Sequence, residues 1–113
     1  MRIWIHNMGT VEFYCYYKID PEKSDIFNVL AKKIFDLYSD RRGCLSYRCS
    51  IGLDPERKNT AMESGEFTDL KTFHELRETI EKQNPEIFGA LDAVIQGGLK
   101  ARKYEFFTSL LTS

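Results

Sequence analysis

The sequence predicts an α+β fold of the ferredoxin-like type, with the element order βαββαβ and one four-stranded antiparallel sheet. Two observations support it: a strongly alternating strand that leads into a proline-started helix at Asp20-Pro21, and a second alternating strand directly after Gly43. A hairpin partner, two helical segments and a last strand follow. The strands are predicted at residues 11–19, 44–53, 59–67 and 99–107.

The first strand alternates without interruption, as expected when one face of a sheet is buried. Its apolar face carries Val11, Phe13, Cys15, Tyr17 and Ile19, and its other face carries Glu12, Tyr14, Tyr16 and Lys18. The strand is therefore expected to cover a core with one face only.

The first helix begins with a capping residue and a proline. Asp20 can accept hydrogen bonds from free backbone amides, and proline suits the first helical position. Apolar residues then recur at helical spacing, and Gly43 favours a left-handed exit. The predicted apolar positions are Ile26, Phe27, Leu30, Ile34, Leu37 and Tyr38.

The second and third strands form a hairpin around Asp54-Pro55. Alternation puts Ser46, Arg48 and Ser50 opposite an apolar face, whereas the third strand is mixed on both faces. The apolar face of the second strand is predicted to carry Leu45, Tyr47, Cys49, Ile51 and Leu53.

Two more helices precede the last strand. Thr68 or Asp69 caps the first of them, Asn84-Pro85 restarts the second, and Gly97-Gly98 ends it. Their inward positions are predicted to be Leu70, Phe73, Leu76 and Ile80, then Ile87, Phe88, Leu91, Val94 and Ile95. Residues 1–113 are expected to form one domain, with 1–10 a possible extension: an edge strand over Arg2–His6 and a turn at Met8-Gly9-Thr10.

Composition excludes several classes of partner. The net charge is −1, from 16 Lys plus Arg against 17 Asp plus Glu, which argues against nucleic acid. The third strand also lacks the glycine–aromatic motif of RNA-recognition domains. No apolar run is long enough to span a membrane, and no metal-ligand spacing is found. Three cysteines without CxxC spacing are interpreted as reduced thiols in a cytoplasmic protein.

The second face of the predicted sheet is neither plainly polar nor plainly apolar. Tyr14, Tyr16 and Arg48 are expected to project from it, together with Arg102 and Tyr104. Aromatic side chains among arginines indicate a covered, partly polar cavity. A second copy of the same sheet is the simplest cover, so we expect a homodimer.

A family resemblance appears in two segments. The helix–glycine–strand junction Gly43-Cys44-Leu45-Ser46-Tyr47-Arg48 and the later Gly65-Glu66-Phe67-Thr68-Asp69-Leu70-Lys71-Thr72-Phe73 resemble the antibiotic biosynthesis monooxygenase-like group of dimeric α+β barrels. The resemblance covers roughly residues 11–107. It implies a homodimer in which each protomer holds a small-molecule site between its sheet and helices.

The resemblance also implies a range of activities. Some members oxidise aromatic polyketides without a cofactor, some degrade haem, and others are autoinducer-processing or stress proteins. The family often has Trp where Phe67 stands and His nine or ten residues later, where this chain has Leu76 and Arg77. No cofactor is therefore expected, although haem binding stays open.

The candidate catalytic residues are His74, Tyr16 and Arg48, and the candidate substrate-binding residues are Tyr14, Tyr16, Arg48, Phe67 and Tyr104. His74 could act as a general base near neutral pH, or be an ordinary edge residue of its helix. The tyrosines could stack on a ring or pack at an interface. A shielded Arg48 would need a carboxylate from a ligand or from Glu12, Glu63 or Glu66.

Two functions remain open. One is a small oxygenase-like enzyme that acts without a cofactor on a planar aromatic or quinol-like substrate. The other is a non-catalytic dimeric module that binds a small molecule or has a stress-related role on the same fold. Fold alone does not distinguish them.

Overall fold

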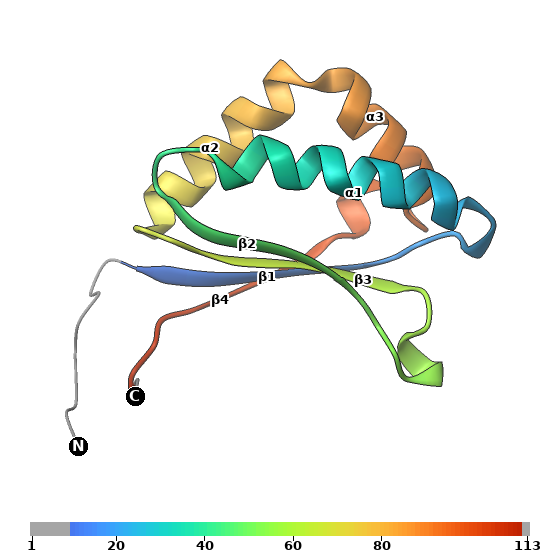
Figure 1. Cartoon of the computed structure of the whole chain (residues 1–113), viewed down its shortest axis with the longest axis horizontal. Coiled ribbons are helices and arrows are strands. Elements are labelled where there is room, and N and C mark those ends of the chain that lie inside the picture. Colours follow the sequence, from blue (N-terminus) through green and yellow to red (C-terminus); the bar gives the residue numbers. More distant parts are fainter. Residues whose placement is uncertain (1–9, 112–113) are drawn as a thin grey trace.

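A computed structural model describes residues 10–111 and has two layers, a four-stranded sheet and three helices (Figure 1). The sheet order is β2-β3-β1-β4, and every neighbouring pair is antiparallel. The predicted fold class is confirmed. The elements are β1 (Val11–Lys18), α1 (Ser24–Ser39), β2 (Cys44–Ile51), β3 (Thr60–Phe67), α2 (Leu70–Gln83), α3 (Pro85–Val94) and β4 (Lys103–Phe107), with short 3-10 turns η1 (Pro21–Lys23), η2 (Pro55–Arg57) and η3 (Leu99–Ala101).

The core lies between the sheet and the helices. The predicted apolar face of β1 is confirmed in full, since all five of its side chains are buried. The aromatic rings of Phe13, Phe67 and Phe73 meet there at centroid distances of 4.7–5.6 Å. Rings in edge-to-face and tilted contact fill this space densely and fix how α2 packs on the sheet.

The start of α1 differs slightly from the prediction. The Asp20 carboxylate accepts a hydrogen bond from the Glu22 amide at 3.0 Å, but the first turn is the 3-10 turn η1. The buried stripe of α1 then carries Phe27, Leu30, Ile34 and Tyr38, whereas Ile26 is 53% exposed. Ile26 was wrongly placed on the buried face because it is the neighbour of Phe27 and lies about 100° away around the helix.

A bulge interrupts the alternation of β2. Cys44 pairs with Phe67 and Ser46 pairs with Glu66, so Leu45 is an extra residue without a partner on β3. Leu45 is exposed and Tyr47 is buried. The predicted apolar face of β2 is therefore right at Tyr47 and Cys49. It is wrong at Leu45, at Ile51, which is 52% exposed, and at Leu53, which lies beyond the strand and is 95% exposed.

The second half of the chain follows the predicted order with shifted ends. The Asp69 carboxylate caps α2 by accepting from the Thr72 amide, and Leu70, predicted to face inward, is 43% exposed. Gly97 and Gly98 both have positive φ, as expected for a helix exit. The turn η3 follows them, so β4 begins at Lys103 rather than at residue 99.

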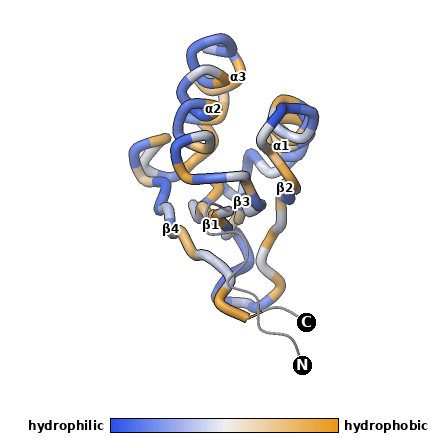
Figure 2. The backbone as a smooth tube through the Cα atoms, turned by 90° about the vertical axis from the view of Figure 1, so that its left-hand side faces the viewer, coloured by the Kyte–Doolittle hydropathy of each residue, from blue (hydrophilic) through white to orange (hydrophobic). Residues whose placement is uncertain are grey.

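All three helices lie on one face of the sheet, and no described element covers the other face (Figures 1 and 2). We call this second surface the open face; it carries Glu12, Tyr14, Tyr16, Lys18, Arg48, Ser50, Thr60, Met62, Ser64, Glu66, Lys103, Glu105 and Phe107. The predicted edge strand over Arg2–His6, and all but the last residue of the turn that follows it, lie outside the described residues.

Candidate functional site

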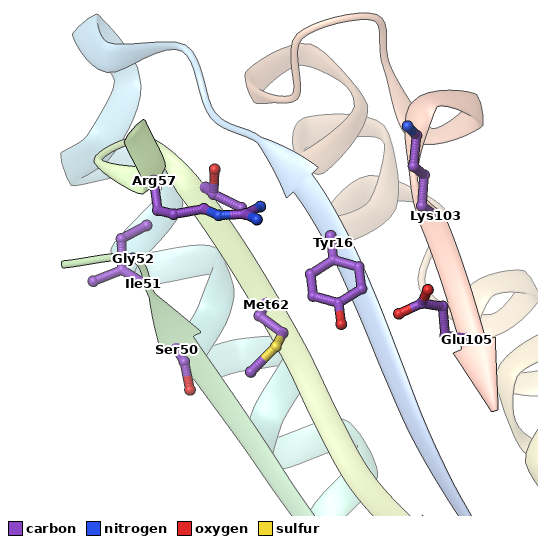
Figure 3. Close-up of a pocket in the computed structure, with 9 residues that line it drawn as sticks. Tyr16, Ser50, Ile51, Gly52, Arg57, Met62, Lys103 and Glu105 are labelled. Atoms are coloured by element: carbon purple, nitrogen blue, oxygen red, sulfur yellow. The ribbon is translucent and has the colours of Figure 1, made fainter. Parts of the chain in front are cut away.

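The open face carries two hollows that meet at Met62. The first has a volume of about 480 Å³ and lies where β1 ends and β4 begins. In Figure 3 the Arg57 side chain extends from the β2–β3 connection toward Tyr16, while Lys103 and Glu105 stand on the other side. The pocket is lined by Tyr16, Ser50, Ile51, Gly52, Arg57, Thr60, Met62, Lys103 and Glu105.

Polar groups without a protein partner face this pocket. Within residues 10–111, neither Arg57 nor Lys103 forms an ion pair. The Thr60 hydroxyl is buried and has no hydrogen-bond partner there. The pKa of the Tyr16 hydroxyl is raised, first by its partial burial and then by the neighbouring Glu105.

Arg48 lies in the second hollow of the open face, of about 310 Å³, beside Tyr14, Glu12 and Glu66. It is exposed, and none of the ion pairs among the described residues includes it. The expectation of a shielded, paired Arg48 is therefore wrong for the single chain. The cause is that β2 is an edge strand and that nothing in the chain covers its open side.

Arg102 and Tyr104 face the helices instead of the open face. Tyr104 pairs with Cys15, whose side chain points into the core, so Tyr104 lies on the same face as Cys15. The expected projection of Tyr104 from the open face is therefore wrong, because a shift of one residue along β4 turns a side chain to the other face. The Arg102 guanidinium, whose side chain is 7% exposed, donates to both carboxylate oxygens of Glu81 at 3.1 and 3.3 Å. The Arg77 guanidinium lies over the Tyr104 ring, with its Cζ atom 4.4 Å from the ring centroid.

The remaining predicted site residues also lie on the helix side. Phe67 is fully buried in the aromatic core. His74 is exposed on α2, where its ring contacts Phe73 and Phe106 at about 5.5 Å. It lines a third hollow with Arg77, Glu78, Glu81 and Lys82.

The structure does not bring the three candidate catalytic residues together. Tyr16, Arg48 and His74 line three different hollows, and His74 is separated from the other two by the thickness of the sheet. Tyr14 and Arg48 do share a hollow. Within one chain, His74 is therefore not positioned to take a proton from a ligand held between Tyr16 and Arg48.

A buried carboxylate, named from the sequence only as a possible partner of Arg48, instead forms a site of its own on the other side of the sheet. Glu63 of β3 is 7% exposed and points toward the helices. It accepts hydrogen bonds from the hydroxyls of Tyr17 on β1 and Tyr47 on β2, one to each carboxylate oxygen. Tyr38 of α1 stacks on Tyr47 with ring centroids 4.6 Å apart and planes 8° from parallel. The result is a carboxylate held by two phenols inside an aromatic wall.

Burial changes the acidity of the groups around Glu63. Burial first and the Glu63 charge second raise the pKa of Tyr17, Tyr38 and Tyr47 well above the usual range of a phenol. The same two causes raise the pKa of the Cys15 and Cys49 thiols to about 12. These groups therefore stay protonated at neutral pH, and the hydroxyls of Tyr17 and Tyr47 remain donors to the carboxylate.

The signal for this site was present in the flanking strands. Tyr17 and Tyr47 lie on the predicted apolar faces of the strands on either side of β3, and a buried tyrosine hydroxyl usually needs an acceptor. Glu63 is the polar residue of β3 that register places between them, opposite Cys15 and Cys49. A register for the mixed third strand would have identified it.

The described residues hold neither a metal-ligand cluster nor a membrane-spanning helix. Between residues 10 and 111, no group of three or more His, Cys, Asp or Glu side chains is arranged to hold a metal ion. In the same range, no helix combines the length and the apolar character needed to cross a membrane.

Comparison with known proteins shows the fold. No protein-family profile and no curated protein sequence matches the chain. Among solved structures, a conserved protein from Methanosarcina mazei superimposes with a TM-score of 0.71 at 19% identity, over 89% of this chain and 93% of that one. SnoaB, a cofactor-independent oxygenase from Streptomyces nogalater, gives a TM-score of 0.71 at 13% identity, over 92% and 96%.

A third similar structure carries the name of the family. It is a candidate antibiotic biosynthesis monooxygenase from Deinococcus radiodurans, with a TM-score of 0.68 at 15% identity over 88% of this chain and 91% of that one. These identities are too low to transfer an activity, but the shared architecture covers most of each chain. The resemblance in the sequence is therefore confirmed at the level of structure: the chain has the fold of the antibiotic biosynthesis monooxygenase-like proteins.

Proposed function

We propose that this protein is an oxygenase-like enzyme that acts without a cofactor on a planar phenolic or quinol-like substrate. The observation that carries the proposal is the Glu63 carboxylate, which is buried between two phenolic hydroxyls. The tyrosines already present to Glu63 the O–H group that a phenolic substrate would present. The likeness to SnoaB, a cofactor-independent oxygenase, supports the same reaction class.

The chemistry needs a base shielded from water. A substrate phenol would replace one tyrosine hydroxyl and give its proton to Glu63, which leaves an electron-rich anion for O₂ to oxidise. For a ring CH₂ activated by neighbouring phenols, one O₂ is consumed, one oxygen atom becomes a carbonyl on carbon, and the other leaves as water with the two hydrogens. The aromatic wall of Tyr38 and Phe13 beside Tyr47 would stack on the ring.

Tyr47 is the tyrosine that we expect a substrate to displace. It belongs to the edge strand β2, next to the Leu45 bulge, and its ring contacts the partly exposed Phe35. Tyr17, in contrast, lies on a central strand. Entry from the β2 edge therefore requires the smallest rearrangement of the core.

Oxygen uptake with a panel of quinols and anthrone-like phenols tests the proposal. Glu63→Gln keeps the shape and one acceptor but removes the base, so turnover should fall by about 10²–10⁴-fold. Tyr16→Phe, Arg48→Met and His74→Ala test the residues proposed from the sequence, and the proposal predicts smaller effects for all three. If Glu63→Gln consumes oxygen as fast as the unaltered protein, Glu63 is not the base.

A non-catalytic binding module is the second candidate, and one observation favours it. Both Glu63 oxygens already have partners, and the surrounding aromatic side chains are packed in ring contacts. Such a cluster also suits a purely structural role. Saturable binding of a quinol without oxygen uptake above the buffer rate would select this function.

We also propose that two copies pair through their open faces. That face carries both signs of charge: Glu12, Glu66 and Glu105 among acids, and Lys18, Arg48 and Lys103 among bases, with Arg57 of η2 beside them. An isologous interface could place acids against bases, and it would cover Tyr14, Met62 and the half-exposed Phe107. The three cysteines of the chain are free thiols, which supports a reducing compartment such as the cytoplasm.

A further inference from the structure

The proposed oxygenase reaction uses the Glu63 carboxylate but gives no chemical role to the two hydroxyls that hold it. Tyr47 donates to one carboxylate oxygen, Oε1, and Tyr17 donates to the other, Oε2. Burial first and the Glu63 charge second raise the pKa of both phenols, so both keep their protons at neutral pH. The cluster therefore holds a proton acceptor and two hydrogen-bond donors side by side in the core.

The groups that hold Glu63 are neutral. Glu63 is 7% exposed, and none of the ion pairs among residues 10–111 includes it. A ligand that reaches this carboxylate therefore displaces a hydroxyl rather than a cation. In such an apolar site, a fixed hydrogen-bond donor stabilises a developing negative charge much more than it does in water.

Small side chains surround Glu63 on the helix-facing side of the sheet. Register places Cys15 and Cys49 directly opposite it on β1 and β2, and alternation places Ala61 and Gly65 two residues away on its own strand. The two tyrosine rings reach over these small residues to the carboxylate. An outward turn of one ring would expose a flat floor beside the carboxylate.

Tyr47 and Tyr17 differ in how firmly the sheet holds them. Tyr47 belongs to the edge strand β2 and follows the Leu45 bulge, whereas Tyr17 belongs to the central strand β1. Breaking the one hydrogen bond between Tyr47 and Glu63 frees an acceptor and a donor at the same time. An enolisable ketone carries the complementary pair on neighbouring atoms, an acidic α-hydrogen and a carbonyl oxygen.

We infer that the Glu63 cluster also catalyses the enolisation and isomerisation of flat, uncharged cyclic ketones, a reaction that consumes no oxygen. Glu63 Oε1 takes a proton from the α-carbon, the C–H electron pair forms the C=C bond of the enolate, and the carbonyl π pair moves onto oxygen, to which the Tyr47 hydroxyl donates a hydrogen bond. In a β,γ-unsaturated ketone the proton returns from Glu63 to the γ-carbon, which gives the conjugated isomer without any change of oxidation state.

Tyr17 is a positioning residue in this reaction, because it keeps its hydrogen bond to Oε2 and fixes the direction of Oε1. The inference rests on the same Glu63 base as the proposed function. It differs in needing the Tyr47 hydroxyl as a donor and in needing no O₂.

The test is run under argon with the unaltered protein. Conversion of cyclohex-3-enone is followed by the ultraviolet absorbance of its conjugated isomer, and enolisation of 2-tetralone by the loss of its α-hydrogen NMR signals in D₂O. We expect rates at least about 10³-fold above those with free acetate at the same concentration, because the carboxylate and the hydroxyl are held in place. Acceleration of either reaction supports the inference, and acceleration of neither overturns it.

Variants assign the roles. Glu63→Gln should slow isomerisation by about 10²–10⁴-fold. Tyr47→Phe should lower kcat by about 10²–10³-fold with little change in KM, because its hydroxyl contacts the enolate oxygen. Tyr17→Phe should have a smaller effect, and Glu75→Gln, on the exposed side of α2, should have none. Each Tyr→Phe change removes one hydrogen bond to Glu63, so a Tyr47→Phe protein no slower than Tyr17→Phe would contradict the assigned donor.

An inhibitor gives a readout that does not depend on how well the variants fold. 2-Naphthol resembles the enol of 2-tetralone, with flat rings and an O–H group that can donate to Glu63, whereas 2-methoxynaphthalene lacks that hydrogen. We expect 2-naphthol to inhibit isomerisation competitively and at least about tenfold more strongly than the ether. Equal inhibition by the two would contradict the binding of the enol at the carboxylate.

Oxygen separates this activity from the proposed function. Isomerisation under argon without oxygen uptake from phenols in air supports the inference and refutes the oxygenase; oxygen uptake without isomerisation does the reverse. Tyr47→Phe gives a second comparison, because a phenolic substrate displaces the Tyr47 hydroxyl and does not use it. That variant should take up oxygen at nearly the unaltered rate while its isomerisation falls, and an equal loss of both activities would contradict the separate role of Tyr47.

Discussion

Glu63 lies in a row of apolar side chains, where a carboxylate without partners would be strongly unfavourable. Its stability depends on the two tyrosine hydroxyls, one for each oxygen. Neither hydroxyl can be replaced by water without opening the core. Each tyrosine therefore contributes to folding in addition to any role with a substrate.

Removing one donor should lower the free energy of unfolding. For Tyr17→Phe and Tyr47→Phe we expect a loss of about 1–3 kcal/mol each, because one carboxylate oxygen is left unpaired. Tyr14→Phe, on the open face, should change stability by less than about 0.5 kcal/mol. Urea denaturation of the three variants measures this, and equal values for all three would mean that the buried hydrogen bonds are not stabilising.

The buried thiols predict how stability depends on pH. An unfolded cysteine loses its proton near pH 9, whereas Cys15 and Cys49 keep theirs until about pH 12. Their contribution is thus complete below pH 9 and is lost as the pH rises from 9 to 12. The buried tyrosines act with the same sign, because burial raises their pKa as well.

Urea midpoints at pH 7, 8 and 10.5 test this dependence. The free energy of unfolding should be the same at the two lower pH values. At pH 10.5 it should be lower by about 1–2 kcal/mol through Cys15 alone. Cys15→Ala should be less stable at pH 8 but should show a shallower decline. A stability that rises above pH 9 would contradict the assignment.

At the residue scale, the sequence predicted side-chain burial correctly where the alternation of a single strand determines it. The burial of Cys15 and Tyr17 followed from alternation alone. Glu63 was missed because its environment depends on two neighbouring strands at once, and a one-residue change of register would have turned it to the open face.

Among the elements, α2 and β4 are joined by a buried ion pair. Arg102 precedes β4 and contacts Glu81 of α2 through two nitrogens, and its side chain also donates to the Leu99 carbonyl. Glu81 has a second partner in Arg77 at 3.2 Å. Glu81 would therefore keep a partner if Arg102 were removed, whereas Arg102 would lose its carboxylate if Glu81 were removed.

Because Glu81 has two cationic partners and Arg102 has one carboxylate, substitutions at the two residues should destabilise the protein to different extents. Glu81→Gln should lower the free energy of unfolding by about 2–3 kcal/mol, since it leaves the nearly buried Arg102 without an anion. Arg102→Met should lower it by only about 1 kcal/mol, because Glu81 keeps Arg77. Chemical denaturation of both variants and of the double variant decides, and a larger loss for Arg102→Met would reverse the argument.

The edge strand β2 shows the limit of periodicity at the scale of elements. Alternation correctly placed Tyr47 inward, but it also placed Leu45 inward, and a bulge exposes that residue. The partner strand carries a feature that fits the bulge: a Cβ on Gly65 would lie 2.2 Å from the Ser46 carbonyl oxygen, so β2 approaches β3 closely at this glycine. The sequence of β2 alone contains no sign of it.

For the whole molecule, the open face makes assembly the property to measure. We expect sedimentation and light scattering at micromolar concentration to give a mass near twice 13.2 kDa. Met62→Glu, at the centre of that face, should shift the mass toward the monomer, and Glu75→Lys on the exposed side of α2 should not. A folded monomer without any substitution would refute the pairing of open faces.

At this scale the order of elements was predictable and the location of the site was not. Strong alternation, two proline-started helices and glycine exits determine βαββαβ. The predicted site combined residues from both faces of the sheet, because the face of β4 depends on where η3 ends. The three-residue turn η3 therefore determines whether the Tyr104 side chain lies on the open face with Tyr16 or faces the core.

The sheet order also has a consequence for how the chain folds during synthesis. Of the four described strands, β1 is made first, and it is a central strand whose partners are β3 and β4 (Figure 1). Glu12 pairs with Phe107, so nearly the whole chain must be made before this edge of the sheet can close. Pairings so distant in sequence form slowly, and until then β1 exposes an apolar strand to other nascent chains. A protein with this topology should depend on chaperones during synthesis more than its size alone suggests.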